Sequence, residues 1–178
     1  MATWNSRGLR GSTLEDLINQ TNEIYRKNEL SLIQKIPTPI TPINIDKVSR
    51  HITLAYFDKK STVDYIGVAQ GIAICFDAKE CEKDTFPLAN IHPHQLKFME
   101  DFEKQSGISF FVIYFSHYKK YYYLSFKEAK YFWNRKEEGG RKSFKIDELT
   151  PSMFFTEKKG ILVPYLDMIN KDLESREN

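Results

Sequence analysis

The eight residues "ISFFVIYF", residues 108–115, constrain the fold of this chain more than any other stretch. Side chains along a strand alternate between the two faces of a sheet, so a half-exposed strand alternates apolar and polar residues. Residues 108–115 are apolar at almost every position, which predicts a strand that is buried on both faces. A central sheet with helices on both sides provides that environment, so we expect a fold of the α/β class.

The other expected elements mix helices and strands, without an internal repeat or a low-complexity tract. A helix begins at Ser12 or Thr13, each of which has an acid three residues later as in a capping box, and it continues to about Lys27. Further strands are expected at 30–36, 51–57 and 121–126, and as a pair within 61–80 that turns near Gly67 to Gly71. Further helices are expected within 86–107 and at 127–136 and 163–174.

The length of 178 residues and the hydrophobic content of 41% suit one domain with a real core. We place this domain at residues 12–178, after a flexible N-terminal arm of residues 1–11. Residues 37–50, "PTPITPINIDKVSR", contain three prolines, which cannot donate to a sheet ladder and favour extended backbone. The segment is either a disordered linker or, because 51–57 reads as a returning strand, one side of a projecting two-stranded arm. We favour the arm, at about residues 37–58.

The net charge of the chain is only +2, but the charges are unevenly distributed. Nine basic and three acidic residues lie between Lys119 and Lys145, so this stretch carries +6. The asymmetry is compatible with a polyanionic partner and equally with a solvated lysine-rich face. No apolar run approaches the roughly 20 residues needed to cross a bilayer, and the first residues lack a secretory signal. We expect a cytoplasmic protein without a membrane partner, with Cys75 and Cys81 as reduced thiols.

Two acids and a lysine form the strongest chemical signal: Asp64, then Asp77 after twelve residues, then Lys79 after one. If the two strands within 61–80 pair antiparallel, Asp64 comes close to Asp77, and Lys79 shares a strand face with Asp77. Two adjacent carboxylates repel unless a cation or a shared proton relieves them, and their hard oxygens suit Mg²⁺ or Mn²⁺. Lys79 is placed to orient a water molecule or to stabilise transition-state charge. The alternative is a surface salt bridge between Asp77 and Lys79, with Asp64 as a turn residue.

The segments "TVDYIGV" and "ICFDAKE" resemble the signature of the PD-(D/E)xK nucleases. Together with "GSTLEDLINQTN", "KIPTPI", "FPLANIHPHQL" and "FWNRKEEGGRKS", they resemble, in register over roughly residues 5–150, the RecU-type Holliday junction resolvases. The resemblance implies a restriction-endonuclease-like fold, a mixed central β-sheet flanked by helices, with a protruding proline-bounded stalk. It also implies a homodimeric, magnesium-dependent endonuclease that nicks two opposing strands of a four-way DNA junction in recombination and repair.

The resemblance also implies roles for individual residues of this chain. Asp64 and Asp77 would bind Mg²⁺ or Mn²⁺ with the carbonyl of Ala78, Lys79 would position the attacking water, and Glu15 would complete the acidic cluster. Glu15 has a competing role in capping the first helix with Ser12. The implied DNA contacts are Arg7 in the arm, Lys47, Arg50, Tyr56 and Phe57 in the stalk, Gln95, and Arg135, Lys136, Arg141 and Lys142 around a glycine loop. Gln95 also falls where many enzymes of this superfamily carry a supporting glutamine, with a solvent-facing residue as the alternative.

One position departs from the family pattern, because Asp77 stands where close relatives usually carry glutamate. The carboxylate is therefore one methylene shorter. A junction-binding scaffold with weak or no cleavage is the second hypothesis, and a nuclease of broader specificity is the third. Recombinase and branch-migration proteins are further candidate partners. His92 and His94 lack nearby third and fourth ligands for zinc, so we expect Pro93 to begin a helix there.

Overall fold

The computed structural model describes residues 13–57 and 62–176, and these form a mixed α/β fold around a six-stranded sheet. The strand order is β1 (Ser31–Lys35), β4 (Tyr65–Ala69), β5 (Ile72–Cys81), β7 (Ile108–Phe115), β8 (Lys120–Ser125) and β10 (Phe154–Phe155). Only β5 and β7 run parallel, and every other neighbouring pair is antiparallel. The predicted central strand at residues 108–115 is confirmed as β7, which lies between β5 and β8 and is buried along nearly its whole length.

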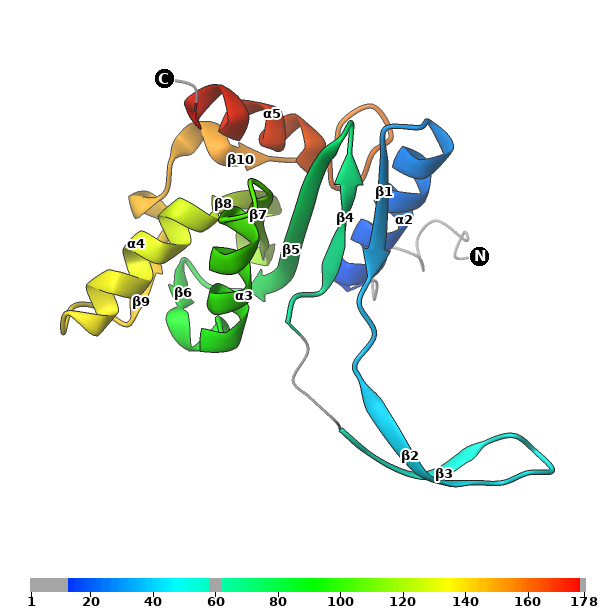
Figure 1. Ribbon diagram of the computed structural model, residues 1–178. Coiled ribbons are helices and arrows are strands. Elements are labelled where there is room, and N and C mark those ends of the chain that lie inside the picture. Colours follow the sequence, from blue (N-terminus) through cyan, green and yellow to red (C-terminus); the bar gives the residue numbers. More distant parts are fainter. Residues whose placement is uncertain (1–12, 58–61, 177–178) are drawn as a thin grey trace, which may run out of the picture.

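Four α-helices of the described residues cover the two faces of this sheet (Figure 1). The helices α2 (Leu14–Lys27) and α5 (Tyr165–Arg176) pack on one face, where Phe76 and Phe110 belong to the core. The helices α3 (Pro93–Glu103) and α4 (Phe126–Glu137) pack on the other, where Phe111 and Ile113 belong to a second core. Residues that alternate along β7 therefore enter different cores, as the strand period of two requires.

The expected first helix is confirmed, and its N-cap is Thr13. The side chain of Thr13 accepts a hydrogen bond from the amide of Asp16, and the Asp16 carboxylate accepts one from the Thr13 amide, which completes a capping box. Ser12, like the arm of residues 1–11, lies outside the described residues. In the described part of the chain, no helix is long and apolar enough to cross a membrane.

The turn expected near Gly67 to Gly71 lies at Gln70 and Gly71, both of which have positive φ. Gly67 instead lies inside β4. A Cβ at Gly67 would come within 2.1 Å of the Leu32 carbonyl oxygen, so glycine is needed there for the close approach of β1 rather than for a turn.

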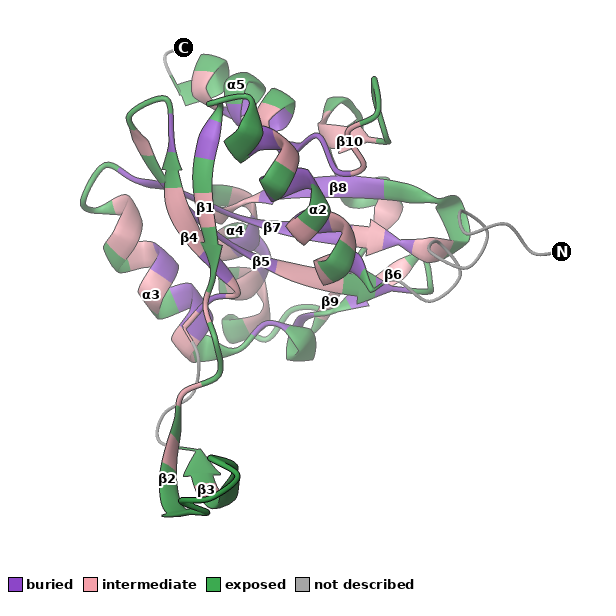
Figure 2. Cartoon of the chain, turned by 90° about the vertical axis from the view of Figure 1, so that its right-hand side faces the viewer, coloured by how far each residue is buried: buried purple, intermediate pink, exposed green. Residues whose placement is uncertain are grey.

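Residues 40–57 leave the main sheet and form a separate two-stranded sheet (Figure 1). The strands β2 (Ile40–Ile45) and β3 (Ile52–Phe57) pair antiparallel, and Figure 2 shows them projecting beyond the main sheet with mostly exposed residues. The loop between them is held by Asp46, whose carboxylate accepts hydrogen bonds from the Val48 amide and the Ser49 hydroxyl. We call residues 37–58 the stalk; residues 58–61, at its return to the sheet, lie outside the described residues.

Three short elements were not expected from the sequence. The strands β6 (Thr85–Pro87) and β9 (Ser143–Lys145) pair antiparallel, and β10 extends the main sheet by two residues. Short 3₁₀ turns occur at Leu88–Asn90, Ser116–Tyr118, Ile146–Glu148 and Pro151–Met153. The β6–β9 pair matters for the site because it holds the loop after α4 next to the residues that precede α3.

Candidate active site

The register of β4 and β5 brings Asp64 and Asp77 together. Tyr65 pairs with Phe76, so Asp64, just before β4, comes next to Asp77. The chain then leaves the sheet, and residues 77–81 of β5 pair with β7 alone. Asp64 Oδ2 accepts a hydrogen bond of 2.8 Å from the amide of Ala78 on this open edge of β5. Asp64 and Asp77 therefore lie next to each other in the structure, as expected.

Asp77 is fully buried and is surrounded by three polar groups. Its carboxylate forms an ion pair with Lys79, whose side chain is 16% exposed, and Oδ2 accepts a hydrogen bond of 2.5 Å from Gln95. Burial and then the charge of Asp64 raise the pKa of Asp77 to about 7, although Lys79 opposes the shift. The pairing of Asp77 and Lys79 therefore exists, but in the interior and not on the surface.

Gln95 has a supporting position in this site. The helix α3 begins with Pro93, and the Gln95 side chain accepts a hydrogen bond from the His92 amide while it donates to Asp77. Both ends of the side-chain amide are used inside the protein, and the residue is only 6% exposed. The prediction that Gln95 contacts DNA is therefore not supported by its position, because its amide holds Asp77 and is turned away from solvent.

Glu15 lies near the site, but its carboxylate is paired elsewhere. It forms an ion pair with Lys35, at the end of β1, and the Glu15 backbone carbonyl accepts a hydrogen bond of 3.2 Å from the Tyr65 hydroxyl. Lys35 also lies close enough to Asp64 for their charges to interact. Its hydrogen bond to Glu15, and then the negative charges of Glu15, Asp64 and Asp16, raise the pKa of Lys35. In residues 13–57 and 62–176, no group of three or more His, Cys, Asp or Glu side chains is arranged to hold a metal ion. The expected cluster of three carboxylates is therefore not formed.

Asp64 and Asp77 nevertheless fit a hard divalent cation. Both supply carboxylate oxygens, which Mg²⁺ and Mn²⁺ prefer as ligands. Asp77 Oδ1 is buried and lies against the ammonium group of Lys79. A divalent cation between the two neighbouring carboxylates would relieve their repulsion, which the Lys79 ammonium offsets only in part.

The stalk residues expected to touch DNA are all solvent-exposed. Lys47 and Arg50 flank the tip, and Arg50 has a positive φ of 57°. Tyr56 and Phe57 are 51% and 77% exposed. Large apolar side chains are exposed along both stalk strands, so the stalk presents an apolar and basic surface to solvent.

The four basic residues around the glycine loop divide into two groups. Arg135 is used internally, because it pairs with Glu148, donates 2.7 Å to the Ser143 carbonyl and stacks 5.0 Å from the Phe132 ring centroid. Its predicted DNA contact conflicts with this arrangement, in which the guanidinium holds the loop.

Lys136 lies 3.6 Å from the centroid of the Trp133 ring and pairs with Glu137. In contrast, Arg141 and Lys142 are exposed, and the Leu88 amide donates to the Lys142 carbonyl, which places them beside the 3₁₀ turn Leu88–Asn90 that precedes α3. Arg7 lies outside the described residues.

Two residues of this region were missed from the sequence. Lys35 pairs with Glu15, and Glu80 accepts a hydrogen bond of 2.6 Å from the Leu14 amide. Glu80 directly follows Lys79 and so points to the opposite face of β5. That alternation was a usable signal, but the partner is 66 residues away in the chain and could not be read from it.

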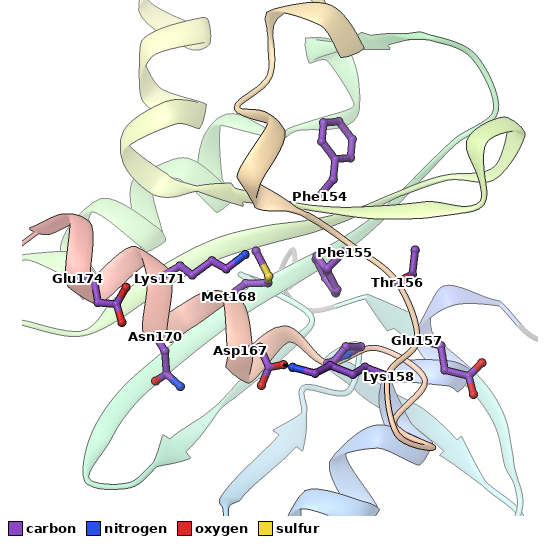
Figure 3. A pocket seen from close by; sticks show the side chains of 11 residues that line it. Phe154, Phe155, Thr156, Glu157, Lys158, Asp167, Met168, Asn170, Lys171 and Glu174 are labelled. Atoms are coloured by element: carbon purple, nitrogen blue, oxygen red, sulfur yellow. Dashed lines mark hydrogen bonds and ion pairs between the residues drawn. The ribbon is translucent and has the colours of Figure 1, made fainter.

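A hollow between β10 and α5 lies apart from these residues (Figure 3). The ion pair of Lys158 and Asp167 crosses it at 2.6 Å. None of the predicted catalytic or DNA-binding residues lines this hollow, so we do not assign the chemistry to it.

Comparison with known proteins agrees with the resemblance. The sequence model of the family described as Recombination protein U matches residues 9–171. The chain belongs to the RecU family. The Holliday junction resolvase RecU of Pediococcus pentosaceus is 40% identical to it over 173 residues, 94% of this chain and 86% of that protein. The Holliday junction resolvase RecU of Bacillus subtilis (strain 168) is 42% identical over 149 residues, 82% of this chain and 71% of that protein.

Among solved structures, Hjc of Archaeoglobus fulgidus, a Holliday junction resolvase, aligns with 61% of this chain and 72% of that chain. The TM-score is 0.32 and the sequence identity 6%.

Proposed function

We propose that this RecU-family protein is a Holliday junction resolvase, a metal-dependent endonuclease that nicks two opposing strands of a four-way junction. One observation carries the proposal: Asp64 and Asp77 meet at the open edge of β5 with Lys79 beside them. The relationship to Holliday junction resolvases of the RecU family supports a four-way DNA junction as the substrate. The six-stranded mixed sheet would then be a restriction-endonuclease-like core, and the chain would act in the cytoplasm as one nuclease domain with the stalk inserted.

Asp64 and Asp77, with the carbonyl of Ala78, would hold Mg²⁺ or Mn²⁺. The ion would neutralise charge at the scissile phosphate and lower the pKa of a bound water. Asp77 must be ionised for this role, and Gln95 holds its carboxylate in one orientation by a hydrogen bond that is itself fixed by His92. Glu15 would join the site once its carboxylate leaves Lys35.

Lys79 would hold the attacking water and place positive charge near the developing negative charge of the phosphate. Its side chain is mostly buried and its ammonium already lies at Asp77. Replacing this lysine by a neutral residue would therefore remove a positive charge beside the reacting atoms.

The stalk and the exposed basic residues would select the junction. The stalks of a homodimer would enter the open centre of the junction with Lys47, Arg50, Tyr56 and Phe57, while Arg141 and Lys142 follow the phosphates of an arm. A two-fold dimer matches paired symmetric cuts in a four-way junction.

A labelled four-way junction and a labelled linear duplex, each with Mg²⁺, Mn²⁺ or EDTA, test the proposal. We expect junction cleavage with either metal and none with EDTA. Asp77→Asn and Lys79→Ala should abolish cleavage while junction binding remains. Asp101→Asn and Lys171→Ala, which change exposed residues of α3 and α5, serve as matched controls. Wild-type cleavage rates in both site variants would falsify the assignment.

A second candidate function is a junction-binding scaffold, because the shorter Asp77 is fully buried and already paired with Lys79. Such a protein would bind the junction with strong salt dependence and give no product with either metal. A nuclease of broader specificity would cut the linear duplex as fast as the junction.

A further inference from the structure

Two side chains that neighbour the proposed catalytic residues in sequence reach across to the first turn of α2. Tyr65 follows Asp64, and Glu80 follows Lys79, so both point to the face of the sheet that α2 covers. Glu80 accepts a hydrogen bond of 2.6 Å from the amide of Leu14. The Tyr65 hydroxyl lies 3.2 Å from the carbonyl of Glu15 and 3.0 Å from Asn19 Oδ1, two acceptors of α2 that share its one hydrogen. The strands that carry the metal site thus contact the first turns of α2 through both side chains.

The Glu80 carboxylate provides an acceptor for an unpaired amide at the N-terminus of α2. The first amides of an α-helix have no partner within the helix, and the Thr13 side chain satisfies the amide of Asp16. The Leu14 amide remains, and Leu14 is only 2% exposed, so its amide is largely shielded from water. A carboxylate is a favourable partner there because the helix N-terminus carries partial positive charge.

The location of this bond connects it to the site. Residues 77–81 of β5 have an open edge, and the Asp64 carboxylate is bonded to the Ala78 amide on that edge. Glu80 lies two residues further along, and Leu14 directly precedes Glu15. The bond therefore holds the backbone of Glu15 at the same end of β5 as the two aspartates.

We propose that Glu80 is a positioning residue for the metal site. It anchors the first turn of α2 to the catalytic strand, so that Glu15 is held where its carboxylate can join Asp64 and Asp77 once it leaves Lys35. The inference rests on the proposed function, because it requires Glu15 to assist the metal bound by Asp64 and Asp77.

Binding of Mn²⁺ to the full-length protein, measured by calorimetry and electron paramagnetic resonance, tests the role without relying on cleavage. Glu80→Ala should weaken Mn²⁺ binding roughly tenfold, the lower end of what loss of an outer residue costs a metal site. Glu80→Gln keeps an acceptor oxygen for the Leu14 amide and should stay within about twofold of the wild type. Glu82→Ala removes an exposed acid two residues further along and is the control for the change of charge.

A purely structural anchor and a positioning residue differ in a double-mutant cycle. If Glu80 acts through Glu15, Glu15→Ala weakens Mn²⁺ binding as Glu80→Ala does, and the double variant is no weaker than Glu15→Ala. Losses that multiply in the double variant, or an unchanged affinity in either single variant, overturn the proposal. Should Glu80→Ala not fold, Glu80→Asp shortens the acid by one methylene and gives the same comparison.

Failure of the metal-site assignment has a different signature. In that case Asp77→Asn also binds Mn²⁺ as tightly as the wild type, which overturns both the proposed function and this inference. If Asp77→Asn loses the metal while Glu80→Ala keeps it, the metal site stands and only the role of Glu80 is refuted.

Discussion

Replacing Asp77 by asparagine should remove a loss of stability that the wild type shows as the pH rises, because Asp77 is buried. Burial and the neighbouring Asp64 raise the pKa of Asp77 from 3.8 to about 7 in the folded protein, whereas the unfolded chain has no such environment. A raised carboxyl pKa means that the folded state binds the proton more tightly than the unfolded state. The contribution of Asp77 to stability is therefore greatest at low pH and falls as the pH rises from about 4 to 7.

The two pKa values imply that the metal-free wild type loses roughly 2–3 kcal/mol between pH 5 and pH 8 through this one group. Asparagine has nearly the same shape and no charge, so Asp77→Asn should not show that loss. For a chain of this size, the difference in melting temperature between variant and wild type should grow by roughly 5–10 °C from pH 5 to pH 8.

The measurement is thermal unfolding in EDTA at a series of pH values, with Asp101→Asn as the matched control. Asp101 is an exposed residue whose pKa is lowered by its hydrogen bond to Lys97, so its replacement should not reproduce the effect. Parallel pH profiles for Asp77→Asn and the wild type would refute the reasoning, because they would mean that Asp77 is not held in a low-dielectric site beside a second carboxylate. Saturating Mg²⁺ should stabilise the wild type at pH 8 and leave Asp77→Asn unchanged.

Three further outcomes are expected. Lys47→Ala should weaken junction binding and lower the slope of log affinity against log salt by about 0.9, measured by fluorescence anisotropy, whereas Lys171→Ala on α5 should leave the slope unchanged. Gly67→Ala should lower the melting temperature sharply, because its Cβ would lie 2.1 Å from a backbone carbonyl oxygen of β1; an unchanged melting temperature would contradict that close approach. Gln95→Ala should cost about 1–3 kcal/mol in denaturant unfolding, since it leaves a buried oxygen of Asp77 without its donor.

The Lys35–Glu15 and Lys79–Asp77 pairs have a common feature. Each joins a carboxylate of the proposed metal site to a lysine of the same protein. A lysine beside a carboxylate offsets part of the repulsion between clustered acids when no other cation is present. The same lysines would remain close by as positive charges once a metal and a phosphate bind. They would therefore suit both the metal-free site and the site with metal and DNA bound.

The sequence by itself determined the local features of this protein. An uninterrupted apolar run predicted the buried strand β7, and helical spacing with a capping signal predicted α2 to within a residue. The order of two acids and a lysine predicted their meeting on the condition that the two strands pair antiparallel, and the structure sets that register through the turn at Gln70 and Gly71. These inferences needed only the two-residue period of a strand, the 3.6-residue period of a helix and one expected turn.

The tertiary structure alone decided which of these groups are buried and which partners they take. Arg135 is withdrawn from solvent by Glu148, Asp77 is enclosed by Gln95, and Glu80 caps a helix that begins 66 residues earlier. Each contact joins different elements, which only the tertiary arrangement places side by side. Charge and residue type are properties of the sequence, but burial, and with it the pKa of Asp77, depends on what packs around a side chain.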